Sequence, residues 1–552
     1  MPSRWLNIIL VIMLAGCAAQ GPPGGGPEDK EGPVLISSVP KDMETNVTGL
    51  SEIFLEFSEP VQIKNAESRL MISPTLLTKP EVEIKGRKVV IKNIKGLQKD
   101  VTYIVSLGRS VQDLHGNFAK EDIRIAFSTG DSIDNSSILG TVYNLPKKLN
   151  CFILAYRARD SFPDSLLGSL PDYICQVGEN GSYKFRNLSP GVYRLLAVCT
   201  RLSDPLKDKQ LSLIGLPPFS EINVEKSGQT VDRVNFYIQE VELSPFRVVS
   251  YKIEKGILRI RFTHKLKEDS LSVASVDFVD ANSVKARSTW VANGNENVLN
   301  VGLDVIGERL KGKLALRGLL DIYGKKLCDT LALDLEWKSY VDSVPPSVVD
   351  VIPRNGARDV DPDVEVRLDF SEPVVIDSGG IEILVDSASI GFEKRVLDSN
   401  TLILKLAGGE NLAGREFIIR ADGRRIYDLS GLTMSDTVVS YRFTTLSLAQ
   451  TGSISGHLIS NIEKKELLMV EAIRDDGKFK RAVRAGADGE FLIEYLLPGK
   501  YSLFVWYDKD GDCIFDGGKV FPYTPSEPFW FPENRIRVRA RWETAGEEVI
   551  LD

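Results

Sequence analysis

The densest group of potential metal ligands lies near the carboxyl terminus, in a loop with a carboxylate at almost every second position. Aspartates stand at positions one, three, five and nine of this loop, and position seven offers a backbone carbonyl. These are hard oxygen ligands of the kind that Ca²⁺ prefers. The sequence therefore predicts a structural Ca²⁺ site formed by Asp508, Asp510, Asp512, Ile514 and Asp516.

The loop departs from the common twelve-residue calcium loop at two positions. The sixth residue is Cys513, where a glycine usually makes the sharp turn, and the twelfth is Lys519, where a bidentate glutamate usually binds the ion. The alternative is a surface turn without metal, in which the aspartates bond to nearby backbone N–H groups and Gly511 bends the chain. The sequence leaves both interpretations open.

Two segments that follow this loop have the chemistry of a protein-binding surface. Arginine alternates with apolar residues in Arg535, Arg537, Arg539 and Arg541, so a single strand would display all four guanidinium groups on one face. Such a row can bind carboxylates or phosphates, but it is also the pattern of a solvated strand face. Upstream, proline excludes the run 521–532 from a regular sheet, and its aromatic residues either pack over a domain edge or anchor a partner. The candidate partner-binding residues are Phe529, Trp530, Phe531 and these four arginines.

Motifs of catalysis are missing from the sequence. It holds no G-x-S-x-G, no phosphate-binding loop, no H-E-x-x-H and no cysteine with a histidine nearby. The three histidines, His115, His264 and His457, stand in separate stretches. We therefore predict that the protein is not an enzyme. A hydrolase with its site at a domain junction is the remote alternative, because paired carboxylates across a groove leave no sequence motif.

The elements that must position these residues repeat along the chain. An alternating strand at 53–57 ends in Ser58-Glu59-Pro60, and an equivalent strand at 366–370 ends in Ser371-Glu372-Pro373. We interpret this motif as strand termination rather than catalysis, since proline removes a ladder donor and the serine and glutamate satisfy the turn. A middle segment, 257–266, keeps the alternation but replaces the motif, and is a degenerate third copy.

The second half of each copy carries Asp-x-x-Gly before its last strand. The aspartates are Asp113, Asp321 and Asp428, and in each copy we expect the aspartate to cap its own turn and the glycine to adopt a positive φ. Short alternating strands between such turns are typical of an antiparallel β-sandwich, and Ile53, Leu55 and Phe57 should point inward with Glu56 outward. The opening Pro-Pro, Phe-Ser-Glu-Pro-Val, Asp-x-x-Gly and closing Phe-Ser/Thr-Thr resemble the bacterial Ig-like domains first named in S-layer proteins.

A second unit also occurs twice. Asn180-Gly181 precedes the turn Pro190-Gly191-Val192-Tyr193, and Asp488-Gly489 precedes Pro498-Gly499-Lys500-Tyr501. Asn-Gly and Asp-Gly favour tight hairpins, and the tyrosine of each Pro-Gly-x-Tyr turn should anchor a core. These units resemble transthyretin-like, carboxypeptidase-regulatory and pilin-B-type sandwiches.

The repeats predict an all-β chain of tandem antiparallel sandwiches behind a lipoprotein signal peptide. We number the predicted modules 1 to 5 and use these names below. The predicted segments are a signal peptide at 1–16, a flexible tether at 17–32, Ig-like module 1 at 33–131, transthyretin-like module 2 at 136–240, degenerate Ig-like module 3 at 244–338, Ig-like module 4 at 345–446 and transthyretin-like module 5 at 451–552.

The amino terminus predicts the location. Arg4 precedes an apolar run that is too short to cross a bilayer but suits a signal peptide. Leu14-Ala15-Gly16-Cys17 then resembles the lipobox of bacterial lipoproteins. This resemblance implies that Cys17 is lipidated and that the lipid anchors the protein to a membrane. The module order and the ending Arg539-Ala540-Arg541-Trp542 resemble a family of Bacteroidetes envelope lipoproteins. That resemblance implies the outer membrane and leaves its face open.

Composition excludes one class of partner and limits metal chemistry. The formal net charge of −8 gives no electrostatic basis for binding a nucleic acid. Apart from Cys17, five cysteines are spread along the chain without a C-x-x-C, so their spacing predicts neither a zinc site nor a disulfide framework. Cys151 and Cys199 fall in one module and either pair or behave as small buried residues.

These observations favour a non-enzymatic lipoprotein of the outer membrane that acts as a scaffold or accessory subunit of an envelope protein complex, in assembly, export or surface organisation. Other envelope proteins are then its partners. No cofactor is required, and the Ca²⁺ predicted above would be a structural ion. A glycan-binding or adhesion module is the alternative, because sandwich loops and exposed aromatic residues also stack on sugar rings.

Overall fold

The structure is a computed structural model that describes residues 30–551 with short internal gaps. The signal peptide, Cys17 and most of the tether lie outside the described residues, as does the side chain of Cys328. The gaps are at 77, 159–160, 164–165, 168, 203–204, 209–210, 268–269, 272–275, 280–283, 293–294, 306–308, 337–340, 399 and 407–411.

The chain is 51% strand and 3% helix, which confirms the all-β prediction. It divides into two compact units, which are described separately. The first extends to Gln239 and includes Lys519–Pro525, and the second comprises Glu240–Gly518 with Ser526–Asp552. Within the described residues, no helix has the length and apolar character needed to span a membrane.

The described residues of module 1, in the first unit, form two antiparallel sheets and one short helix. The four-stranded sheet has the order β1-β2-β5-β4, and the three-stranded sheet has the order β3-β6-β7. The elements are β1 (Leu35–Val39), β2 (Ile53–Phe57), α2 (Ala66–Arg69), β3 (Met71–Ser73), β4 (Glu81–Lys85), β5 (Lys88–Lys92), β6 (Thr102–Gly108) and β7 (Ile123–Ser128).

Module 2 follows in the same unit with one sheet in the order β10-β9-β12-β13-β17, to which β14 adds by pairing β12. In the facing layer, β11-β8-β15 form a sheet and β16 also pairs β8. The strands are β8 (Ser136–Tyr143), β9 (Asn150–Arg157), β10 (Tyr173–Gln176), β11 (Ser182–Leu188), β12 (Gly191–Thr200), β13 (Leu213–Gly215), β14 (Ile222–Val224), β15 (Thr230–Val231), β16 (Phe236–Tyr237) and β17 (Gln239–Glu240), with a 3₁₀ turn at Pro205–Lys207.

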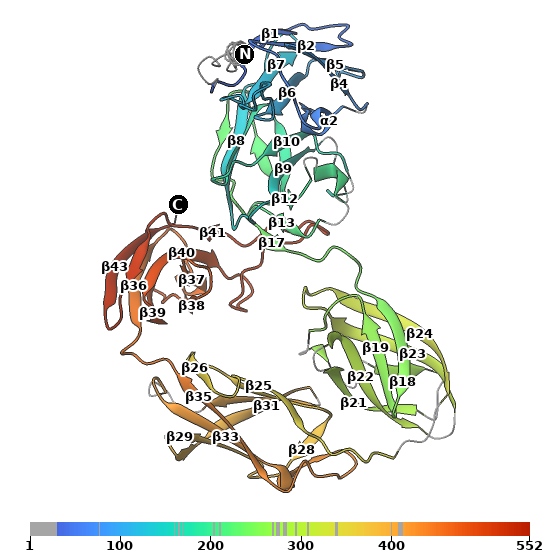
Figure 1. Cartoon of the computed structure of the whole chain (residues 1–552), viewed down its shortest axis with the longest axis vertical. Helices are drawn as coiled ribbons and strands as arrows, with labels where there is room; N and C mark the ends of the chain where they lie inside the picture. Colours follow the sequence, from blue (N-terminus) through green and yellow to red (C-terminus); the bar gives the residue numbers. More distant parts are fainter. Residues whose placement is uncertain are drawn as a thin grey trace, which may run out of the picture. The chain divides into compact units, whose positions relative to one another are not determined.

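Module 3, in the second unit, repeats the arrangement of module 1 with longer strands. Its sheets have the orders β18-β19-β22-β21 and β20-β23-β24. Figure 1 labels all of these strands except β20. The strands are β18 (Val248–Glu254), β19 (Ile257–Phe262), β20 (Val276–Val279), β21 (Val284–Ala292), β22 (Asn295–Val305), β23 (Arg309–Leu320) and β24 (Lys326–Glu336).

Module 4 has the sheets β25-β27-β32-β31 and β26-β35-β33-β29-β30, and the pair β28-β34. Its strands are β25 (Val348–Ile352), β26 (Ala357–Val360), β27 (Val366–Phe370), β28 (Val374–Ile376), β29 (Ile381–Val385), β30 (Ala388–Ile390), β31 (Phe392–Asp398), β32 (Thr401–Leu406), β33 (Glu416–Asp422), β34 (Ile426–Asp428) and β35 (Val438–Thr445), with a 3₁₀ turn at Gly423–Arg425.

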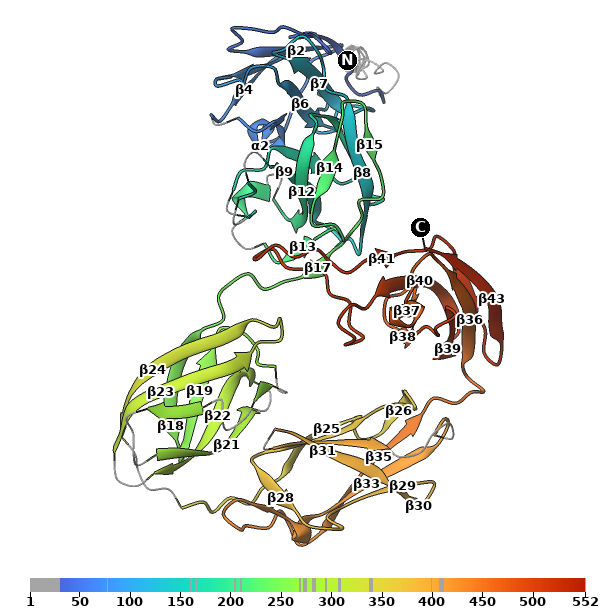
Figure 2. The same ribbon diagram turned by 180° about the vertical axis from the view of Figure 1, so that it is seen from behind.

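Module 5 combines the sheet β39-β36-β43 with the sheet β38-β37-β40-β41, where β42 also pairs β40. In Figure 2, as in Figure 1, β39, β36 and β43 run side by side. The strands are β36 (Gly452–Ile459), β37 (Leu468–Arg474), β38 (Lys480–Arg484), β39 (Glu490–Leu496), β40 (Gly499–Tyr507), β41 (Phe529–Trp530), β42 (Ile536–Val538) and β43 (Glu543–Ile550), with a 3₁₀ turn at Lys465–Leu467.

Buried apolar side chains of the described residues form five clusters, and each cluster draws its members from a different module. In β2, Ile53, Leu55 and Phe57 are buried and Glu56 is not, which confirms the predicted alternation. The strand period of two side chains produces this pattern, because every second residue faces the opposite sheet. The exact module boundaries stay predictions.

The predicted turn chemistry is also present. The glycines of the three Asp-x-x-Gly turns, Gly116, Gly324 and Gly431, all have positive φ. The two Pro-Gly-x-Tyr tyrosines are fully buried, and each donates its hydroxyl to the carbonyl four residues earlier. Tyr193 bonds to Ser189 at 2.5 Å and Tyr501 to Leu497 at 2.7 Å.

Candidate functional site

The aspartate loop 508–516 follows β40 directly, and its carboxylates are used mainly as turn caps. Asp510 Oδ1 accepts from the N–H of Asp512, and Asp512 Oδ1 accepts from the N–H of Ile514. Asp516 Oδ1 accepts from the N–H of Gly518. This is the local bonding expected of the turn interpretation.

The structure groups only part of the predicted ligand set. Oxygens of Asp508, Asp510 and Glu527 lie within 4.8 Å of one another. In the described part of the chain, neither Asp512 nor Asp516 belongs to a carboxylate group of this kind. Glu527 is 4% exposed and receives the N–H groups of Lys509 at 2.6 Å and Asp516 at 3.0 Å. The predicted ligand list therefore omits Glu527, and Ca²⁺ binding by the loop stays a prediction.

Glu527 escapes sequence analysis because it follows the loop by eleven residues in a proline-rich segment. Burial raises the pKa of Glu527, and the carboxylates of Asp508 and Asp510 act in the same direction. Burial also opposes ionisation of Asp508, but the N–H groups of Cys513 and Gly511 and the Arg484 guanidinium outweigh it and lower its pKa. Arg484 Nη2 lies 2.6 Å from Asp508 Oδ2 and so supplies part of the positive charge.

The partner-binding candidates divide into a packed group and an exposed group. Phe529 is buried, its ring centroid lies 5.5 Å from that of Phe515, and Trp530 packs against the core of module 5. The ring centroid of Phe531 lies 4.7 Å from that of Phe504. The three aromatic side chains thus pack on their own sandwich, which is the first of the two alternatives for this segment.

The four arginines do not share one strand. Strand β42 covers only Ile536–Val538, and Arg541 follows in a turn with φ 65°. Arg535 pairs with Asp475 at 2.8 Å. Arg537 and Arg539 are exposed and line a groove together with Lys500. The basic surface is therefore smaller than the alternation predicts.

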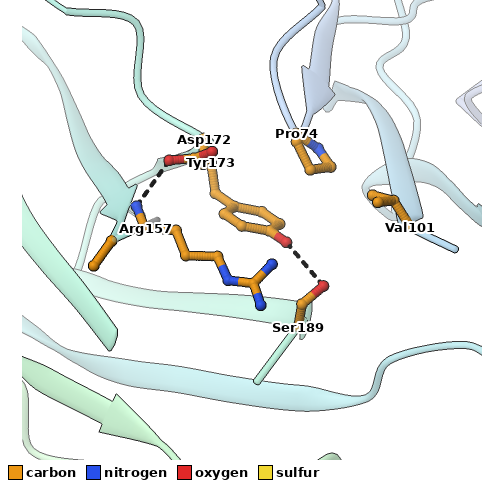
Figure 3. Close-up of a pocket in the computed structure, with 7 residues that line it drawn as sticks. Pro74, Val101, Arg157, Asp172, Tyr173 and Ser189 are labelled. Atoms are coloured by element: carbon orange, nitrogen blue, oxygen red, sulfur yellow. Dashed lines mark hydrogen bonds between the residues drawn. The ribbon is translucent and has the colours of Figure 1, made fainter. Parts of the chain in front are cut away.

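A cavity of about 300 Å³ lies where modules 1 and 2 meet inside the first unit (Figure 3). Arg157 donates to the carbonyl of Pro190 at 2.5 Å, and Asp172 Oδ2 accepts from the N–H of Arg157 at 2.8 Å. The lining includes one carboxylate, Asp172, and no histidine or cysteine. The lining residues are Pro74, Val101, Arg157, Ala158, Asp172, Tyr173 and Ser189.

Comparison with known families identifies two of the modules. Residues 29–129 and 342–445 match the family described as bacterial Ig-like domain. The chain therefore contains two bacterial Ig-like domains, in modules 1 and 4, where the repeated motifs are complete. No catalytic family is indicated. No curated protein matches the chain.

Solved structures that are similar to this chain have low sequence identity and low TM-scores. The major pilin subunit BcpA of Bacillus cereus is 10% identical, with 76% of this chain and 98% of that chain covered and a TM-score of 0.14. The N-terminal part of the bacterial S-layer protein SbsC is 14% identical, with 36% and 44% covered and a TM-score of 0.15. At these scores the similarity carries no information about function.

Proposed function

We propose that this chain is a non-catalytic outer-membrane lipoprotein, anchored through Cys17, whose β-sandwich modules act as a scaffold or accessory subunit for other envelope proteins. The observation that carries the proposal is how the repeated carboxylates are used. Asp113 is fully buried and its Oδ1 accepts from two backbone N–H groups of its own turn, and Asp321 does the same. Because these aspartates stabilise turns, we assign partner binding to the surfaces of the sandwiches.

The disulfide of module 2 supports export. Cys151 on β9 and Cys199 on β12 lie opposite each other in the sheet and are joined as a disulfide. Structural disulfides persist in oxidising compartments such as the periplasm and the cell surface. The pairing that the sequence left open therefore agrees with a protein that leaves the cytoplasm.

Lipid attachment is tested by mass spectrometry of the amino-terminal peptide from native membranes, together with a Cys17→Ala variant. The proposal expects an acylated Cys17 and a variant that leaves the membrane fraction. A wild-type chain that is unmodified and released by a salt wash contradicts the anchor.

The groove formed by Lys500, Arg537 and Arg539 is the surface we assign to a protein partner, and its charge suits an acidic segment. A photo-crosslinker placed at Ala540, which lines the groove, should capture a specific envelope protein in intact cells. The Arg537→Glu variant should lose that product, because like charges repel. The matched control is Lys478→Glu, an exposed residue of the same module. Equal crosslinking by both variants contradicts this surface.

A glycan-binding role has one observation in its favour, the 67% exposure of Trp542. An exposed indole can stack on a sugar ring. A glycan array probed with the wild type and Trp542→Ala decides between the roles, because binding that disappears in the variant supports the glycan role and an array without binding excludes it.

A further inference from the structure

The three Asp-x-x-Gly turns are built alike around the first oxygen of their aspartate. In modules 1, 3 and 4, Oδ1 accepts from the backbone N–H groups two and four residues later, at distances between 2.7 and 3.0 Å. All three carboxylates are at most 2% exposed. Buried carboxylate oxygens need partners, so the second oxygen, Oδ2, is the informative one.

In two of the three copies this second oxygen has a donor. Asp113 Oδ2 accepts from Asn117 Nδ2 at 2.8 Å, and Asp321 Oδ2 accepts from His264 Nδ1 at 2.6 Å. In module 4, Asp428 Oδ2 is buried and has no hydrogen-bond partner. The residue that corresponds to Asn117 in this copy is Leu432, which has no side-chain donor.

The residue that corresponds to His264 in module 4 is Glu372. Each of the two residues follows a serine or threonine whose hydroxyl oxygen accepts a hydrogen bond from an equivalent backbone N–H group. Thr263 Oγ1 accepts from Arg247 N at 3.1 Å, and Ser371 Oγ accepts from Ser347 N at 3.0 Å. A carboxylate thus stands in module 4 where module 3 has an imidazole.

A third position corresponds as well. Glu242 lies five residues before Arg247, and Asp342 lies five residues before Ser347. In module 3, Glu242 Oε1 is 3.9 Å from His264 Nε2, so the imidazole stands between two carboxylates. In module 4 the imidazole is absent and three carboxylates converge.

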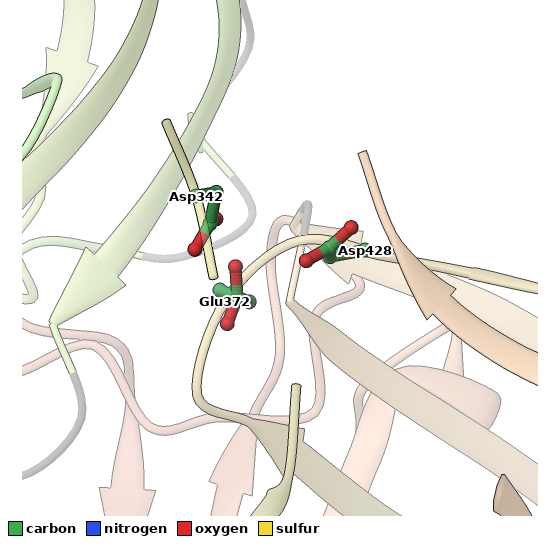
Figure 4. Close-up of side chains that lie close together, drawn as sticks. All are labelled: Asp342, Glu372 and Asp428. Carbon is green, nitrogen blue, oxygen red and sulfur yellow. The ribbon is translucent and has the colours of Figure 1, made fainter. Parts of the chain in front are cut away.

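Figure 4 shows Asp342, Glu372 and Asp428 facing one another, and oxygens of all three lie within 4.8 Å. Asp428 is buried, and Asp342 and Glu372 are partly buried. Like charges at this separation repel, and a buried carboxylate oxygen without a partner is costly. The group therefore lacks the hydrogen-bond donor that His264 supplies to its counterpart in module 3.

We propose that Asp342, Glu372 and Asp428 bind a divalent cation of the Ca²⁺ type, which takes the place that the His264 imidazole occupies in module 3. Three carboxylates are hard oxygen ligands, and Ca²⁺ completes its shell of six to eight oxygens with water or carbonyl groups. Asp342 belongs to the segment that leads into module 4, whereas Glu372 and Asp428 belong to its sandwich. The ion would fasten that entering segment to the module.

The decisive experiment replaces the glutamate with the residue that the chain itself uses in module 3. Ca²⁺ binding to the full-length protein is measured by equilibrium dialysis for the wild type and Glu372→His, after treatment with a chelator. We expect the variant to bind one Ca²⁺ fewer per chain and to remain folded. Because the aspartate loop of module 5 is the same in both proteins, its contribution cancels. The control is Asp436→Asn, an exposed carboxylate of module 4, which should bind as the wild type does.

A second variant keeps the test informative if Glu372→His does not fold. Asp342→Asn changes a residue outside the sandwich core and should weaken Ca²⁺ binding at this site at least tenfold. The reverse replacement, His264→Glu, should create a three-carboxylate group in module 3 and add one bound Ca²⁺. Unchanged stoichiometry and affinity in both Glu372→His and Asp342→Asn overturn the proposal, and would indicate that a shared proton holds the group together.

Discussion

His264 Nδ1 donates to Asp321 Oδ2 at 2.6 Å, and both side chains are almost completely buried in module 3. The other ring nitrogen lies 2.7 Å from the hydroxyl of Ser244. The histidine is therefore bonded on both sides and packs beside Phe246, whose ring centroid is 5.7 Å away. This is a structural histidine that joins the strand ending at Phe262 to the Asp-x-x-Gly turn.

Replacing His264 with alanine should destabilise module 3 by about 2–4 kcal/mol, because it leaves a buried carboxylate oxygen without its partner. Hydrogen exchange of peptides from β19 and β22 measures the loss within the full chain. Thr263→Ser, at the preceding position, keeps its hydroxyl and should change exchange little. Protection equal to the wild type in His264→Ala would show that the pair contributes no stability.

The sequence predicted the fold largely through repetition and period. The buried side chains of β2, the Asp-x-x-Gly turns and the two buried tyrosines follow from short-range rules. These rules hold because alternation and turn chemistry depend on neighbouring residues alone. The Arg535–Arg541 row failed as a single strand, since Arg541 lies in a turn that alternation does not reveal.

The candidate sites depend on long-range contacts, which the sequence did not show. Glu527 joins Asp508 from beyond a glycine- and proline-containing segment, and Asp342 joins Asp428 from the start of module 4. A closer comparison of the repeats contained one signal, namely His264 at the position of Glu372. The structure is needed to interpret this difference, because the sequence does not show that Oδ2 of Asp428 lacks a hydrogen-bond partner.

The Cys151–Cys199 disulfide should contribute to the stability of module 2. It closes a loop with a sequence separation of 48 residues, and replacing both cysteines with alanine should lower the free energy of unfolding of this module by about 2–4 kcal/mol. Differential scanning calorimetry of the full chain measures the effect as a lower Tm for one transition. Cys175→Ala is the single-cysteine control, and a double variant that melts with the wild type would contradict the expectation.

Two free thiols should differ in reactivity. Burial raises the pKa of Cys175 to about 11, whereas Cys513 is exposed. Because only the thiolate reacts, a pKa near 11 leaves about one molecule in a thousand reactive at pH 8. Iodoacetamide should therefore label Cys513 first at pH 8, and labelling of Cys175 should increase up to about pH 11. Peptide mass spectrometry over a pH series checks this, and equal rates at pH 8 would contradict it.

Ca²⁺ binding by the aspartate loop of module 5 is tested through Glu527, the residue that the structure adds to the predicted set. If Asp508, Asp510 and Glu527 hold the ion, Ca²⁺ should raise the Tm of module 5 by mass action, and Glu527→Gln should reduce that increase. Asp512→Asn is the matched control in the same loop, because Asp512 lies outside the group of three oxygens. If the loop is a metal-free turn, Ca²⁺ leaves the Tm of this module unchanged in all three proteins. In that case Arg484 and the backbone N–H groups at Asp508 supply all the positive charge that the turn needs.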